Sequence, residues 1–162
     1  MLFYIIAGFL VLVAVVFVNA VVNNFRSVAG GLDTGDANAD GRSLTGCPET
    51  PNCVSSYPES GYADLSPWEY GDRSRGEART ALIAVLNELP RTEIKKVEDD
   101  YVHAVHRSRI FRFRDDLEFH LPADTGRIDF RAASRLGRGD LGVHEKRMRR
   151  LGEVFADRVQ PS

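Results

Sequence analysis

The chain has 162 residues, 43% of them hydrophobic, and a formal net charge of −2 at pH 7. An acidic balance of this kind argues against nucleic acid as a partner. Once an apolar N-terminal segment is set aside, roughly 120 residues remain, which suffices for one small core and not for two.

The N-terminal segment is almost wholly apolar from residue 2 to residue 22 and carries no charge. As a helix rising ~1.5 Å per residue it spans roughly 31 Å, close to the ~30 Å hydrocarbon core of a bilayer. A cleaved signal peptide is the alternative, but no basic residue precedes the run and the run exceeds ~7–15 residues. We therefore predict a retained transmembrane anchor over residues 1–24, with the membrane as a partner. Arg26 on its C-terminal flank mildly favours a cytoplasmic domain.

Cys47 and Cys53 are the only cysteines, and a turn-rich segment containing two prolines separates them. Their spacing does not suit zinc, whose paired ligands lie two to four residues apart, and it is not the Cys-x-x-Cys of redox proteins. We predict a local disulfide, formed in an oxidising compartment. Two reduced cysteines are the alternative. The disulfide places the domain outside the cytoplasm, so the predicted localisation is a single-pass membrane protein with a periplasmic domain.

Residues 25–46 are rich in Gly, Asp, Asn and Ala and show no apolar periodicity, which predicts a flexible linker. Residues 36–41 match the first half of a calcium-binding loop. The twelfth position is Cys47 where a bidentate Glu is required, so we predict no metal site here. The domain proper is then expected over residues 47–159.

The domain opens with a helix, because Ser74 and Glu77 form a capping box before a helical apolar pattern that ends at Pro90. Four segments of alternating polarity follow and are separated by short polar turns. They predict antiparallel strands over 92–98, 101–108, 117–121 and 128–133.

The last two strands form a hairpin in which two sets of residues match at once. Phe119 faces Phe130 on the core side, and Glu118 faces Arg131 on the other side. In the same register Leu121 faces Ile128, Leu117 faces Ala132, and His120 faces Asp129. The simplest interpretation of the polar residues is a set of cross-strand pairs on a solvated face.

A final helix is predicted from about Leu141 to Val159, with Asp140 at its start and His144 at the boundary of its apolar face. The fold class is therefore α+β. We expect a small antiparallel sheet of about four strands covered by two helices and preceded by the N-terminal transmembrane helix.

The second part of the chain is cationic, with 13 basic and 9 acidic side chains after residue 100. A Gly-rich turn beside several arginines suits a phosphate or carboxylate. Ion pairs with nearby aspartates are the structural alternative. The candidate ligand-binding residues are Arg131, Ser134, Arg135, Gly137, Gly139 and Asp140, with Asp115 and Asp116 as supporting polar groups.

Catalytic residues are not predicted. Ser134 lacks a G-x-S-x-G elbow, and His103 and His106 lie three apart on a strand and so point to opposite faces. A hydrolase that uses Ser134 with a histidine base, acting on envelope or lipid-derived substrates, is the alternative function. No cofactor is predicted.

Three separated motifs occur in order: Cys47 to Ser56, Phe113 to Phe119, and Arg131 to Gly142. Together they resemble the family known as domain of unknown function 1499, over roughly residues 47–151. The resemblance implies a small membrane-associated or extracytoplasmic α+β domain and transfers no catalytic residue. The leading hypothesis is a non-catalytic envelope module that binds an envelope protein or an anionic ligand, or that scaffolds a complex.

Overall fold

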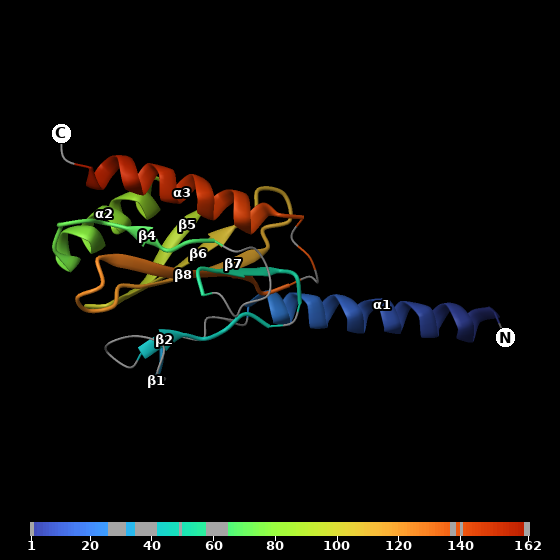
Figure 1. The fold of residues 1–162 in the computed structure, drawn as a ribbon. Coiled ribbons are helices and arrows are strands. Elements are labelled where there is room, and N and C mark those ends of the chain that lie inside the picture. Colours follow the sequence, from blue (N-terminus) through green and yellow to red (C-terminus); the bar gives the residue numbers. More distant parts are fainter. Residues whose placement is uncertain are drawn as a thin grey trace.

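The computed structural model of the chain describes residues 2–25, 32–34, 42–48, 50–57, 65–136, 139 and 141–160. Figure 1 shows the elements in chain order. They are α1 (Leu2–Phe25), β1 (Leu32–Thr34), β2 (Arg42–Leu44), β3 (Cys53–Ser55), β4 (Trp68–Glu69), α2 (Arg75–Glu88), β5 (Thr92–Val97), β6 (Tyr101–Arg107), β7 (Arg114–His120), β8 (Arg127–Ser134) and α3 (Val143–Val159).

The main sheet is antiparallel and has six strands. Five of them follow the order β3-β8-β7-β6-β5, and β4 also pairs with β8. The prediction of about four strands is therefore wrong. The sequence pattern missed β3 and β4 because strands of three and two residues are too short to show a period of two. A separate two-stranded sheet, β1 with β2, lies within the range predicted as a flexible linker.

The predicted register of the last hairpin is confirmed. In β7 and β8, Phe119 pairs with Phe130 and Leu117 with Ala132 on one face. Glu118 pairs with Arg131 on the other face, as expected. Strand β7 begins at Arg114, three residues before the predicted start, which brings both aspartates of the following site into the sheet.

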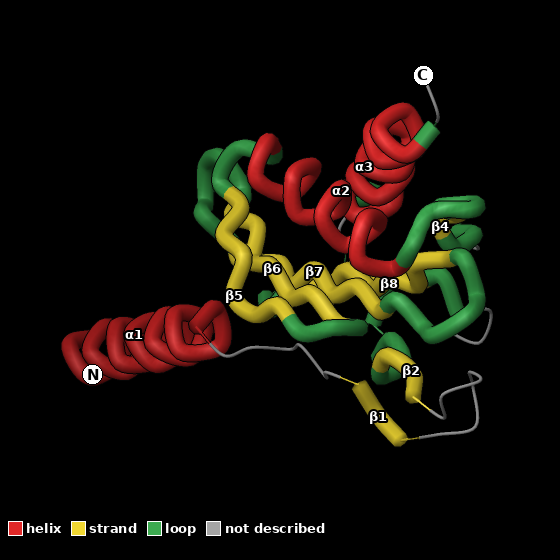
Figure 2. The backbone as a smooth tube through the Cα atoms, turned by 90° about the vertical axis from the view of Figure 1, so that its left-hand side faces the viewer, coloured by secondary structure: helices red, strands yellow, loops and turns green. Residues whose placement is uncertain are grey.

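Two helices, α2 and α3, cover one face of the sheet, while β1 and β2 lie toward the opposite face (Figure 2). The capping box of α2 is confirmed, with the Ser74 amide donating to Glu77 Oε2 at 2.9 Å and the Glu77 amide donating to Ser74 Oγ at 3.3 Å. Helix α3 begins later than predicted, after Gly142, whose φ of 75° places it in the left-handed region.

The apolar core lies between the helices and the sheet, and its centre is aromatic. The Trp68 ring lies 5.5 Å from Phe119, 5.1 Å from Phe130 and 5.7 Å from Phe155, measured between centroids. Trp68 reaches this position because α3 carries Gly152 beside it. A Cβ atom at Gly152 would lie 2.7 Å from Trp68 Nε1, so the glycine leaves the space that the indole occupies.

The N-terminal helix requires a correction. Among the residues that the structure describes, no helix combines the length and apolarity needed to cross a membrane. This finding overturns the predicted transmembrane anchor over residues 1–24 and the single-pass membrane localisation that followed from it.

Candidate ligand-binding site

Two consecutive aspartates on β7 lie on opposite faces of the sheet, because successive residues of a strand alternate. Asp115 accepts a hydrogen bond from Ser134 Oγ at 2.7 Å. Asp116 accepts two from Arg135, from Nε and Nη2, each at 2.8 Å. Ser134, the last residue of β8, and Arg135 directly after it thus bind neighbouring aspartates of β7 on opposite faces. The predicted site residues therefore divide into two separate networks.

The first network, which we name the Ser134 cluster, consists of Asp115, Ser134, His144 and Arg147 on the helix-covered face. His144 Nε2 lies 2.9 Å from Ser134 Oγ. Arg147 Nη1 lies 2.8 Å from Asp115 Oδ2 and 3.4 Å from His144 Nδ1. Asp115 and His144 are buried, so the cluster satisfies polar groups at the end of the core.

The hydrogen-bond directions in the Ser134 cluster decide what it can do chemically. Arginine only donates, so His144 Nδ1 accepts from Arg147 and the ring proton is on Nε2. That Nε2–H donates to Ser134 Oγ, and the serine hydroxyl donates to Asp115. A general base must accept the proton of its serine. His144 donates instead, so this arrangement positions the hydroxyl and does not activate it.

His106 lies beside the Ser134 cluster and is also buried. It pairs with Asp115 across β6 and β7, and its Nδ1 is 3.0 Å from Thr92 Oγ1. Burial, followed by the nearby Arg147 guanidinium, lowers the pKa of His106 to about 4. The ring is therefore neutral at neutral pH, and Arg147 carries the positive charge that neutralises Asp115.

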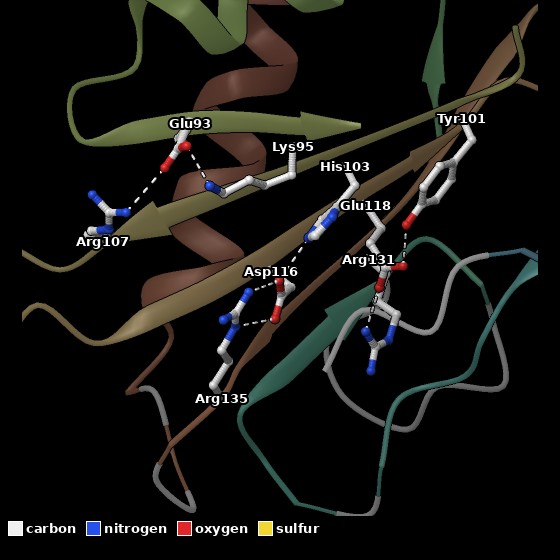
Figure 3. A network of polar contacts seen from close by, with 9 residues as sticks. All are labelled: Glu93, Lys95, Tyr101, His103, Arg107, Asp116, Glu118, Arg131 and Arg135. Carbon is white, nitrogen blue, oxygen red and sulfur yellow. Dashed lines mark hydrogen bonds and ion pairs between the residues drawn. The ribbon is translucent and has the colours of Figure 1, made fainter. Parts of the chain in front are cut away.

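The second network, which we name the polar layer, occupies the opposite face of the sheet (Figure 3). Arg131 Nη1 donates to Glu118 Oε2 at 2.7 Å, and the Tyr101 hydroxyl donates to Glu118 Oε1 at 2.7 Å. His103 Nε2 lies 2.8 Å from Asp116 Oδ1. Burial, then the Glu118 carboxylate, raises the pKa of Tyr101, so the phenol keeps the proton it donates. The full set is Tyr101, His103, Asp116, Glu118, Arg131 and Arg135.

The polar layer corrects the prediction of a solvated face. Glu118 and His120 have exposed fractions of 0%, and Asp129 and Arg131 are also buried. Strand β2 packs against β7 and β8 from this side. Alternating charge alone predicts solvent exposure, because β2, which covers this face, lies about 70 residues or more earlier in the chain.

The candidate residues of the Gly-rich turn have the following positions. Arg131 and Arg135 are directed into the polar layer and bind carboxylates there. Gly139 is exposed. Gly137 and Asp140 lie outside the described residues. The structure therefore brings Ser134 together with Asp115, and Arg135 with Asp116, but separates the two arginines from Ser134 by the sheet.

A groove of about 560 Å³ between α2 and α3 was missed by sequence reasoning. Its walls hold four cationic side chains, Arg91 after α2 and three from the first half of α3. The sequence showed the α3 residues outside the apolar stripe of the helix, but only tertiary packing places Arg91 among them. The lining consists of Val85, Glu88, Leu89, Pro90, Arg91, Val143, Lys146, Arg147, Arg150, Leu151 and Val154.

The charges of this α2–α3 groove are not balanced from within. Among its described lining residues the one carboxylate, Glu88, accepts two hydrogen bonds from Arg158 at 2.7 Å. Arg147 is bound to Asp115, which links the groove to the Ser134 cluster. Lys146 and Arg150 are exposed and, over the described part of the chain, form no ion pair with a carboxylate. A net positive charge therefore faces the groove.

The predicted disulfide is confirmed between Cys47 and Cys53, whose Cα atoms are 5.7 Å apart. It closes the loop that leads into β3. No group of three or more potential metal-ligating side chains is found where the structure describes the chain. The half-motif for calcium at residues 36–41 lies outside that part.

Fold and site together define a small α+β domain with two helices on one sheet face, a buried polar layer on the other, and a cationic groove between the helices. Residues 43–155 match the family described as protein of unknown function DUF1499, and the chain belongs to this family. The match covers more than half of the chain and confirms the resemblance seen in the three motifs. Comparison with curated proteins finds no match.

Proposed function

We propose that this protein is a non-catalytic binding module that takes an anionic ligand in the α2–α3 groove. The observation that carries the proposal is the imbalance of charge in the groove. The groove is lined by Arg91, Lys146, Arg147 and Arg150, and the carboxylate in the described lining, Glu88, already binds Arg158. Guanidinium and ammonium groups around a concave surface are the usual means of binding phosphate or carboxylate.

The groove extends the site that the sequence suggested. Arg131 and Arg135 bind buried carboxylates, whereas Lys146 and Arg150 of α3 are exposed. The Gly-rich turn ends at Gly142, and Val143 directly after it lines the groove. The Gly-rich turn is therefore directly followed in the chain by a residue of the groove.

Binding without catalysis is the better interpretation of the Ser134 cluster. His144 donates to Ser134 rather than accepting from it, and Arg147 holds the ring in that tautomer. The cluster fixes Arg147, whose guanidinium also lines the groove. Its role in this proposal is to position one wall of the ligand site.

The test is a titration of the ¹⁵N-labelled full chain with inorganic phosphate at low salt, read from backbone amide shifts. A non-ionic detergent is included because α1 exposes large apolar side chains. We expect saturable shifts in the first turns of α3. Substituting Lys146→Ala and Arg150→Ala together should weaken binding at least about tenfold, because a hydrogen bond to a charged group contributes roughly 1.5–3 kcal/mol.

Arg149→Ala is the matched control, since Arg149 is on the same helix, is exposed, and binds Glu145 outside the groove. It should leave phosphate binding unchanged. Absence of saturable shifts in the unaltered chain, or equal weakening by Arg149→Ala, would contradict the proposal.

A further inference from the structure

Apart from one carboxylate, the lining of the α2–α3 groove that the structure describes consists of cationic and apolar side chains. Besides the four cations and the engaged Glu88, every lining residue is aliphatic or proline. Within the described lining, no serine, threonine, asparagine, glutamine or tyrosine offers a neutral hydrogen bond. A ligand rich in hydroxyl or amide groups, such as a sugar or a peptide, would lose hydrogen bonds to water here without replacing them.

The apolar and cationic side chains of the groove differ in exposure: buried apolar side chains form its base, and the exposed cations Lys146 and Arg150 form its edge, which we name the rim. Val85 and Leu151 are buried and form apolar surface at the base. Val143 and Val154 line the walls with exposed fractions of 51% and 36%. Lys146 and Arg150 are exposed above them. Exposed valines beside a cationic rim are apolar surface that a ligand could remove from water.

Resting on the proposed function, we infer that the ligand of the groove is an anionic amphiphile, a phosphate or carboxylate head group that carries an alkyl chain. The head group binds the rim cations, and the chain covers Val143, Val154 and Leu89. A volume of about 560 Å³ is within the range of small-molecule sites. Alkyl phosphates and fatty acids share this chemistry.

The experiment compares four probes on the full chain under the conditions of the phosphate titration: inorganic phosphate, hexyl phosphate, hexanoate and 1-hexanol. We expect hexyl phosphate to bind at least about tenfold more tightly than inorganic phosphate, because the chain buries methylene groups. Hexanol should give no saturable shift. Hexanoate then identifies the head group, since binding weaker than that of hexyl phosphate assigns an alkyl phosphate and equal or tighter binding assigns a fatty acid.

The variant Val154→Asn should remove the advantage of hexyl phosphate while leaving the affinity for inorganic phosphate unchanged. Val97→Asn, at an exposed valine of edge strand β5, is the control and should change neither. Equal binding of phosphate and hexyl phosphate would overturn this inference and leave the proposed function standing. Binding of none of the anions would overturn both, and hexanol binding as tightly as hexyl phosphate would overturn the need for an anion.

Discussion

The two faces of β7 and β8 are both buried, yet they are built from opposite chemistry. Phe119 and Glu118 are neighbours in β7, and each has an exposed fraction of 0%. Phe119 contacts the Trp68 ring under the helices, whereas Glu118 binds Arg131 and Tyr101 in the polar layer. Burial alone therefore does not say what a strand residue contributes to the fold.

The two faces of the sheet differ in how they respond when a side chain is replaced. An apolar face is stabilised by contact area and packing, which do not depend on direction. A buried charge is tolerable only while its partner is present, because its desolvation is not otherwise offset. We expect the helix-covered face to set most of the stability of the domain, and the polar layer to fix which strands and segments may pair.

The largest effect is expected from removing an aromatic ring of the helix-covered face. Phe119→Ala should lower the free energy of unfolding by about 3–5 kcal/mol, because a large cavity forms beside Trp68. Chemical denaturation at equilibrium measures it. Phe111→Ala, at a ring that is 71% exposed, should change stability by less than about 0.5 kcal/mol. If both variants lower the free energy of unfolding by similar amounts, the assignment of Phe119 to the core and Phe111 to the surface is contradicted.

The polar layer is tested by removing one partner and then both. Arg131→Met should cost about 3 kcal/mol, because it removes the guanidinium that pairs with the buried Glu118 carboxylate. The double variant Glu118→Met with Arg131→Met should recover most of that loss in the same denaturation measurement. If the double variant is less stable than Arg131→Met alone, the expected recovery is contradicted, and the Glu118–Arg131 ion pair stabilises the fold more than two apolar side chains at these positions.

The third test concerns the polar end of the helix-covered face. His106 has a pKa of about 4 in the folded protein, against about 6.5 when unfolded. The unfolded chain binds the extra proton between these values, so stability is complete above pH 6.5 and falls as the pH drops toward 4. Between pH 7 and pH 5 the loss should be about 1–2 kcal/mol larger than in His106→Gln. If the stability of the unaltered protein and of His106→Gln falls equally between pH 7 and pH 5, the lowered pKa of His106 is contradicted.

The smallest effect is expected where the helix layer meets Trp68. Gly152→Ala places a methyl group 2.7 Å from Trp68 Nε1, and the indole is held by three phenylalanines. Overpacking should outweigh the gain in helix propensity of roughly 1 kcal/mol, for a net loss of about 1 kcal/mol in thermal unfolding. Gly76→Ala in α2 should stabilise the protein instead, because an added Cβ there meets nothing within 4 Å besides its chain neighbours and the backbone of its own helix. If Gly152→Ala also stabilises the protein, the Trp68 side chain has moved to make room for the added methyl group.

Features determined by neighbours in the sequence were predictable, and features created by distant packing were not. The capping box of α2 and the Phe119–Phe130 register depend on residues close in the chain, and both are confirmed. The burial of Glu118 depends on β2, which lies far upstream. Arg91 joins the groove only because α2 and α3 pack together. The candidate site could therefore be predicted as cationic but not located.

The same reasoning explains why the strands were undercounted. Four alternating segments indicated β5 to β8, but β3 and β4 pair with β8 through only three and two residues. Such strands are specified by the partner strand rather than by their own pattern. Their presence could be inferred only by noticing that β8, with β7 on one side, would otherwise leave its other edge unpaired.

The division of one sheet edge between β3 and β4 has a consequence for self-association. β3 pairs with Arg131–Ala133 and β4 with Arg127–Ile128, so β8 presents no long unpaired row of amides and carbonyls to another chain. At the other edge, β5 carries Lys95 and Lys96 and a register shift between Ile94 and Lys96. Short strands, lysines and irregular pairing are the means by which sheets avoid joining edge to edge. Both open sides of this sheet are thus protected against aggregation.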